Sequence, residues 1–142
     1  MTDSVPRLQA VLAAEHAAIF GYGALGPFLT GAARGTAADA EAAHRDRRDA
    51  VAALLVAVKA EPVPAERAYA LPFPVADRAS ALKLALQLEE RTAAAWRAAV
   101  PEVTGADRRT ALAALTDCAV FATRWRRAAA PAAPATVAFP GV

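Results

Sequence analysis

The chain has 142 residues, of which 56 % are hydrophobic and only 6 % aromatic. This length is expected to form one domain, residues 1–142, with a core of its own. The 16 basic and 14 acidic residues leave a net charge of +2, which argues against a protein dedicated to nucleic acid or to membrane surfaces. Alanine, the strongest helix former, supplies much of the hydrophobic content, so the sequence predicts an all-α fold.

The single cysteine, Cys118, cannot form an intramolecular disulfide. A chain of this kind is typical of the reducing cytoplasm. Its first residues do not have the charged and then apolar pattern of a signal peptide. No uncharged apolar run approaches the roughly 18 residues that a membrane-spanning helix needs. We therefore expect a cytoplasmic protein without a membrane or nucleic-acid partner.

The first predicted helix covers residues 5 to about 32, with Asp3 or Ser4 as its cap. Its apolar face carries Glu15 among aliphatic residues. The glycines of the following stretch predict close packing of a neighbouring helix, and Pro27 predicts a kink or an interruption. The residues of this apolar face and of the glycine stretch are Leu8, Val11, Leu12, Ile19, Phe20, Gly21, Gly23 and Gly26.

A turn over Gly31–Gly35 precedes the second predicted helix, residues 36–61, which starts at Thr36 or Asp39 and stops before two prolines. Polar residues lie on the same seven-residue stripe as the apolar ones. The stripe consists of Glu41, His44, Arg48, Val51, Leu55 and Val58. Polar groups on a buried stripe are costly unless they are paired or bind a ligand.

Residues 62–77 form a long irregular connection with four prolines. A connection of this length can run from one end of a helix to the other, so we expect helices two and three to be roughly parallel. The third helix is predicted over residues 78–100, capped by Asp77 or Ser80, with Glu89 on its inner stripe. The fourth is predicted over residues 107–128, and the Pro/Ala tail, residues 129–142, is expected to dock on the bundle.

Glu15, Glu41 and Glu89 thus place carboxylates near the inner stripes of three helices. His44 follows Glu41 by three residues, which puts both side chains on one helix face. Carboxylates and an imidazole are ligands that suit iron or manganese. The sequence therefore indicates a possible metal site in the middle of the bundle.

The order of elements resembles that of the ferritin-like superfamily. The stretches LAAEHAAIFGYGALG, AAHRDRRDAV, AYALPFPV, LEERTAAAWR and AFPGV resemble an actinobacterial ferritin-like family of unknown function. The resemblance implies a four-helix up-down bundle with a long crossover between helices two and three. It also implies a ligand set of Glu15, Glu41, His44 and Glu89, with Glu90 as an alternative to Glu89. In the stretch LTDCAVFATRW of the fourth helix, Asp117 is the only acid and Val120 stands in place of a histidine, so half of the second metal's ligands are missing.

A buried polar network is the other interpretation of the same residues. Arginine forms bidentate pairs with carboxylates, and Arg48, one turn after His44, could fill the space between the glutamates together with Arg45. Tyr22 could donate its hydroxyl into this region. His16 lies about 100° further round the first helix than Glu15 and is expected to bond a backbone carbonyl or a carboxylate.

Three functional hypotheses follow. The favoured one is a ferritin-like homodimer without redox catalysis or a cofactor, acting as a structural or partner-binding protein. The alternative is a metal-dependent oxidase or metal-handling protein with iron or manganese at Glu15, Glu41, His44 and Glu89. The third is small-molecule binding near Tyr22, Tyr69 and Trp96, in an apolar pocket between the helices.

Overall fold

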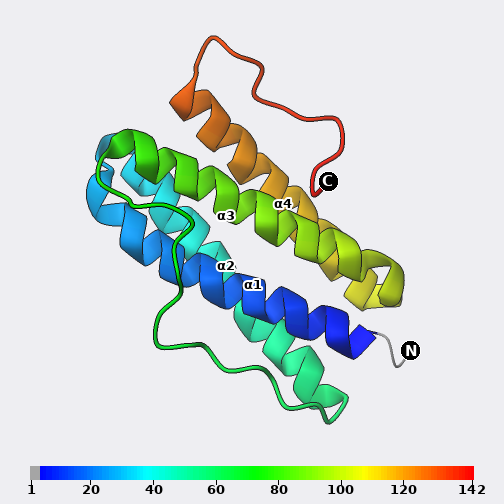
Figure 1. Ribbon diagram of the computed structural model, residues 1–142. Helices are drawn as coiled ribbons and strands as arrows, with labels where there is room; N and C mark the ends of the chain where they lie inside the picture. Colours follow the sequence, from blue (N-terminus) through cyan, green and yellow to red (C-terminus); the bar gives the residue numbers. More distant parts are fainter. Residues whose placement is uncertain (1–3) are drawn as a thin grey trace.

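The computed structural model describes residues 4–142, and the prediction of an all-α four-helix bundle is confirmed (Figure 1). No strand occurs within this range. Among the same residues, no helix is long and apolar enough to cross a membrane. The elements are α1 (Ser4–Leu25), η1 (Gly26–Phe28), α2 (Gly31–Ala57), α3 (Arg78–Ala99), η2 (Val100–Glu102) and α4 (Gly105–Ala129).

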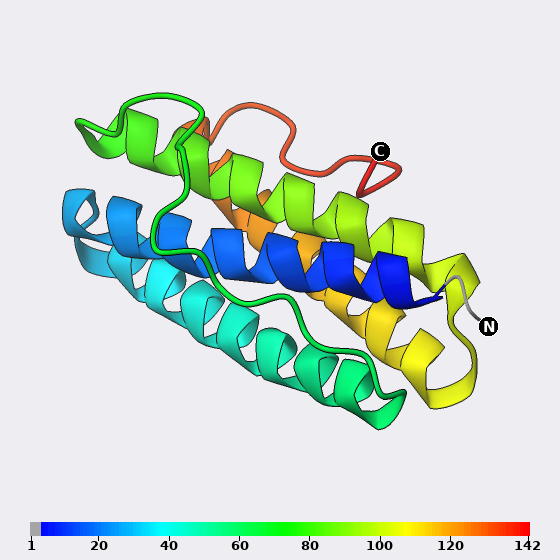
Figure 2. The same ribbon diagram turned by 60° about the horizontal axis from the view of Figure 1, so that its bottom comes forward.

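The long crossover determines how the helices are arranged. After the α1–α2 hairpin, residues 58–77 run back along the length of the bundle before α3 begins (Figure 2). Helices α2 and α3 consequently point in the same direction, and α4 returns antiparallel to α3. The predicted crossover is thus confirmed. It is fastened to α1, since the Gln9 side chain bonds both the Glu61 carbonyl oxygen (2.6 Å) and the Val63 amide (2.8 Å).

Helix boundaries differ from the predicted ones around the first turn of the bundle. Helix α1 ends at Leu25 rather than near residue 32, because Pro27 lacks an amide hydrogen and lies in the short η1 turn. Helix α2 starts at Gly31, so the predicted turn over residues 31–35 is the beginning of this helix. Gly31 has a φ of +57°, a conformation that favours glycine. Asp3, one of the two predicted caps of the first helix, lies outside the described residues.

The start of α3 is capped as expected. Asp77 and Ser80 form a reciprocal capping box, in which the Asp77 carboxylate accepts from the Ser80 amide at 2.8 Å and the Ser80 hydroxyl accepts from the Asp77 amide at 3.1 Å. Two of the orphan amides of the helix terminus are satisfied in this way. The capping box fixes where the crossover ends and α3 begins.

The core is divided into two apolar clusters along the bundle axis. One contains Tyr22, Leu25 and Trp125, and the other contains Leu12 and Trp96. On α1, α2 and α3 the change from one cluster to the other falls near residues 15, 44 and 89. These positions hold Glu15, His44 and Glu89, so a polar layer separates the two clusters.

Gly21 and Gly23 of α1 give a matched pair for testing helix packing. A Cβ at Gly21 would come within 2.6 Å of the Leu88 side chain on α3, whereas a Cβ at Gly23 would meet nothing within 4 Å. We predict that Gly23→Ala stabilises the fold by about 0.5–1 kcal/mol through helix propensity. We predict that Gly21→Ala destabilises it by about 1 kcal/mol through overpacking. Urea denaturation measures both, and equal effects would contradict the close approach.

Candidate functional site: a buried carboxylate–histidine layer

Three helices bring Glu15, His44 and Glu89 together in the middle of the bundle. All three side chains have no solvent exposure. His44 Nδ1 lies 2.5 Å from Glu15 Oε2, and His44 Nε2 lies 2.7 Å from Glu89 Oε2. The imidazole of α2 is therefore held between a carboxyl group of α1 and a carboxyl group of α3, with both ring nitrogens engaged.

The surroundings of His44 favour its charged form. Burial opposes protonation, but the hydrogen bonds to Glu15 and Glu89 and their charges raise the pKa of His44 to about 9. Burial acts to raise the pKa of Glu15, yet the hydrogen bond and charge of His44 and the charge of Arg47 lower it overall. At neutral pH both ring nitrogens of His44 therefore carry protons, and the imidazolium donates to a carboxyl group on each side.

Arg47 connects this layer to the surface of the bundle. Its Nε donates to Glu15 Oε1 at 2.9 Å, and its Nη1 donates to Asp117 Oδ2 on α4 at 2.5 Å. The Arg47 side chain is 11 % exposed and the Asp117 side chain 46 % exposed. Arg47 Nη2 also lies 3.1 Å from His44 Nδ1. Because Nδ1 already carries a proton for Glu15, this contact places two cations side by side.

Aromatic side chains complete the hydrogen bonds of the two glutamates. Trp96 Nε1 donates to Glu15 Oε1 at 2.8 Å, and the Tyr22 hydroxyl donates to Glu89 Oε2 at 2.6 Å. Trp125 Nε1 donates to the Tyr22 oxygen at 2.9 Å. Burial, and then Glu89, raise the pKa of Tyr22 well above its usual value, so the phenol remains a donor.

Two further polar groups lie at this layer. Among residues 4–142, Glu89 Oε1 is the one buried side-chain oxygen or nitrogen atom without a hydrogen-bond partner. Cys118, on α4, is fully buried as a free thiol. Burial, followed by the charge of Glu89, raises the pKa of Cys118 well above its usual value. The thiol is therefore a neutral core side chain, as its lack of exposure also implies.

Other residues singled out from the sequence lie outside the layer. Glu41 is half-buried and pairs with Arg45 at 2.9 Å, one helical turn further along α2. Arg48 pairs with its neighbour Asp49 at 2.8 Å. The remaining two bond elsewhere: Glu90 to Arg126 of α4 at 3.1 Å, and His16 Nε2 to the Val63 carbonyl of the crossover at 3.0 Å.

A shift of one residue in the stripe of α2 explains why Arg47 was missed. The buried positions of this helix are Ala37, Ala40, His44, Val51 and Leu55. They follow the alternating three-and-four spacing of helices that pack at a shallow angle, and this spacing selects residue 47 between His44 and Val51. The three-and-four spacing was present in the sequence. However, alanines surround Ala40 and also occur on the exposed face, so hydrophobicity did not single out the buried positions. The predicted stripe therefore included Glu41 and Arg48, each one residue after an inward position, Ala40 or Arg47.

The donor set at this layer does not fit a di-iron or di-manganese centre. A histidine binds metal through a deprotonated ring nitrogen, and both ring nitrogens of His44 are bonded to carboxyl groups. The guanidinium of Arg47 lies against Glu15, where it would repel a divalent cation. Within residues 4–142, no three His, Cys, Asp or Glu side chains are arranged to hold a metal ion.

The aromatic residues of the small-molecule hypothesis do not share one environment. Tyr22 and Trp96 bond different glutamates inside the layer. Tyr69 packs on the ring of Phe20, with the two centroids 5.6 Å apart. A shallow hollow does reach Tyr22 between α1 and α2, and it is also bordered by Gly23, Arg34 and Glu41.

Fold and site together define an all-α four-helix bundle with a buried, internally paired carboxylate–histidine–arginine layer. A family model described as a domain of unknown function (DUF4439) matches residues 7–142, and the chain belongs to this family. A solved structure, a conserved hypothetical protein, rv2844, from Mycobacterium tuberculosis, is 40 % identical with a TM-score of 0.86. The match covers 89 % of this chain and 97 % of that chain. A comparison with curated proteins found no match.

The raised pKa of His44 predicts how stability changes with pH. The unfolded imidazole loses its proton near pH 6.5, whereas the folded one keeps it to about pH 9. The stabilisation is therefore complete below pH 6.5 and is lost as the pH rises to 9, a fall of about 3 kcal/mol in the free energy of unfolding. Urea denaturation across this range measures it. His44→Gln should abolish the decline, and His16→Gln should retain it; a flat profile for the natural chain would contradict a charged His44.

Arg47 and Arg48 provide a second matched pair. Arg47→Met leaves the buried Glu15 without its guanidinium partner, and we expect a loss of about 3 kcal/mol in the free energy of unfolding. Arg48→Met removes a surface pair with Asp49 and should change stability by less than about 0.5 kcal/mol. Thermal and urea denaturation of both variants test this. Similar losses in the two variants would show that Arg47 has no special place in the layer.

Proposed function

We propose that this protein is a ferritin-like bundle without a di-iron centre, and that it acts in the cytoplasm as a dimeric structural or partner-binding protein. The single observation that carries the proposal is the engagement of His44. Both of its ring nitrogens are bonded to buried carboxyl groups, so the residue best suited to bind a metal serves as the internal cation instead.

The topology supports the ferritin-like part of the proposal. Two helical hairpins are joined by a crossover that runs the length of the bundle, as in bundles with one long crossover connection. The carboxyl groups of Glu15 and Glu89 meet in the middle of these hairpins, where such proteins bind metal. In this chain, His44 and Arg47 supply the positive charge that metal ions would supply there.

The electrostatics support a structural role for the layer. A buried carboxylate without a partner is expensive, and a matched cation with hydrogen bonds offsets that cost. Glu15 receives three donors, from His44, Arg47 and Trp96. Its carboxylate oxygens are thereby satisfied within the protein, with no need of an added ion.

One observation favours a metal-binding alternative. Glu89 Oε1 is buried and has no partner, and buried polar atoms of this kind call for an explanation such as a bound water or ion. Glu15, Glu89 and a neutral His44 would supply oxygen and nitrogen donors of the type that iron and manganese accept. This site would require Arg47 to leave Glu15, and Glu41 is turned away toward Arg45.

Metal loading decides between the two proposals. The purified chain is incubated with Fe(II) or Mn(II) without oxygen, desalted, and measured by elemental analysis and native mass spectrometry. We expect far less than one equivalent of metal, because the imidazolium and the guanidinium repel the ion. Retention of about one equivalent, lost in Glu89→Gln but kept in Glu41→Gln, would overturn the metal-free proposal. Circular dichroism of each variant confirms that it is folded.

A further inference from the structure

The outer face of α4 and the tail beside it expose an unusual amount of apolar surface. Eight large hydrophobic side chains are exposed within residues 4–142, and five of them are on these two segments. Val120 is 44 % exposed on the helix, and Phe139 is 73 % exposed on the tail. The other three are Leu112, Val137 and Val142. Clusters of this kind on a water-exposed surface mark interaction sites.

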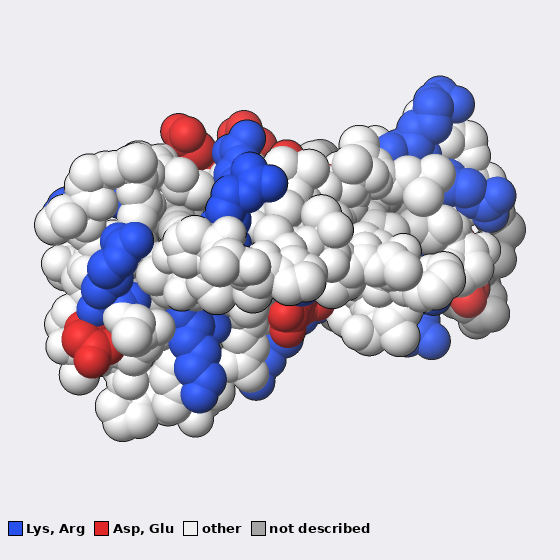
Figure 3. Space-filling model, turned by 90° about the horizontal axis from the view of Figure 1, so that it is seen from above, with Lys and Arg blue, Asp and Glu red and all other residues white. Residues whose placement is uncertain are grey.

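The tail forms one wall of a groove on this face. A hollow of about 430 Å³ lies between α4 and the tail, bordered by Thr116, Val120 and Thr123 on the helix and by Val137 and Pro140 on the tail. Seen from the tail side, most of the surface is uncharged, with separate Lys and Arg and separate Asp and Glu side chains scattered over it (Figure 3). The lining also includes Ala119, Thr136, Arg124 and Arg127. The groove is therefore apolar beside Val120 and Val137 and basic toward the end of α4.

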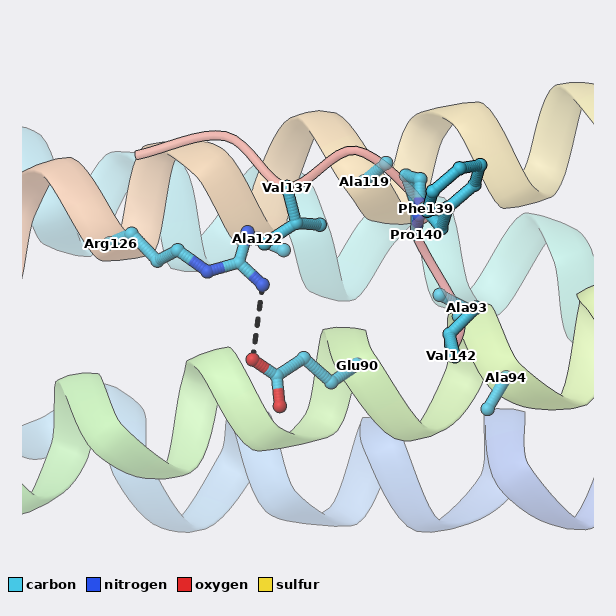
Figure 4. A pocket seen from close by; sticks show the side chains of 11 residues that line it. Glu90, Ala93, Ala94, Ala119, Ala122, Arg126, Val137, Phe139, Pro140 and Val142 are labelled. Carbon is cyan, nitrogen blue, oxygen red and sulfur yellow. Dashed lines mark hydrogen bonds and ion pairs between the residues drawn. The ribbon is translucent and has the colours of Figure 1, made fainter. Parts of the chain in front are cut away.

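Specific contacts fix the tail against the bundle. Arg126 donates to the Ala135 carbonyl at 3.3 Å and pairs with Glu90 of α3 at 3.1 Å. Gly141 has a φ of +82°, and a Cβ there would lie 2.8 Å from the Ala93 carbonyl oxygen. In Figure 4 the Phe139 ring lies beside Pro140, well away from the Glu90–Arg126 pair. The tail thus holds an exposed aromatic ring next to the groove.

We propose that this α4–tail face is the surface through which two copies of the chain pair. This inference rests on the proposed function, in which the protein is a dimer, and it identifies the surface that the two copies share. A two-fold interface needs one face that carries both a projection and a matching depression. Phe139 precedes Pro140, which borders the groove, and its ring is exposed to solvent. In this arrangement each ring can enter the groove of the other copy.

The charges on α4 permit this pairing. If two α4 helices cross antiparallel near Val120, Arg124 of one copy faces the region of Thr116 of the other, and Arg127 faces the region of Ala113. No arginine then opposes an arginine along the groove. The net charge of only +2 for the whole chain also leaves little long-range repulsion between copies. A second copy is therefore the occupant that the shape and the charge of this face favour.

Val120→Glu and Val56→Glu form the test and its control. Val56 is 62 % exposed near the end of α2, away from the proposed face. Light scattering coupled to size exclusion and sedimentation velocity should give twice the 14.7 kDa chain mass for the natural chain and for Val56→Glu. Val120→Glu and Phe139→Glu should raise the dimer dissociation constant about 30-fold or more. Their circular dichroism should be unchanged.

Cysteine trapping locates the interface directly. Val120→Cys lies at the proposed two-fold axis and should form an intermolecular disulfide on mild oxidation, whereas Val56→Cys should not. Cys118 is fully buried and does not compete. A monomeric natural chain at every concentration, or a dimer that is indifferent to both the Val120 and the Phe139 substitutions, would overturn this inference. Metal loading is measured separately, so the outcomes can be told apart. A monomer refutes the interface together with the dimeric part of the proposed function, a dimer indifferent to both substitutions refutes only the interface, and a metal-loaded dimer refutes only the metal-free proposal.

Discussion

The hydrogen-bonded contact of His44 with Glu15 and Glu89 is the interaction on which the rest of the bundle depends. It joins α1, α2 and α3 at one level, and Arg47 extends it to Asp117 on α4. Buried ionisable groups are tolerated only when their partners are in place. The layer therefore demands that four helices be correctly aligned at once, whereas the alanine-rich apolar clusters on either side could tolerate small shifts between helices.

The same layer connects stability with the proposed function. In a bundle that holds metal, the carboxylates need external cations, and folding is linked to metal supply. Here the positive charge is part of the chain, since His44 and Arg47 lie three residues apart on one helix. On the metal-free proposal, the charges of the layer are balanced as soon as the helices pack. A function through surface contacts, with α4 and the tail as the exposed apolar face, would leave a structural role to this layer.

The sequence predicted the helices and the crossover because proline, glycine and capping signals act locally. It also brought Glu15, His44 and Glu89 to one region, since each interrupts an apolar stripe, and it placed the Tyr22 hydroxyl near them. It placed Glu41 and Arg48 on the inward face of α2, but the inward positions are the preceding residues, Ala40 and Arg47. In a helix with alanine on every side, hydrophobic contrast is too weak to fix the inward face to within one residue. The partners of Trp96 and Trp125 depend on contacts between distant segments, which no local pattern specifies.

The two aromatic hydrogen bonds to the glutamates restrict how α1 and α3 can slide. Glu15 and Tyr22 are seven residues apart on α1, Glu89 and Trp96 are seven apart on α3, and the helices run in opposite directions. Each glutamate consequently meets the aromatic donor of the other helix, an arrangement with approximate two-fold symmetry about His44. A slip by one turn would break both pairs together and leave buried donors and acceptors unsatisfied at about 1–3 kcal/mol each. The layer thus selects one axial alignment of α1 and α3 from the several that alanine packing alone would allow.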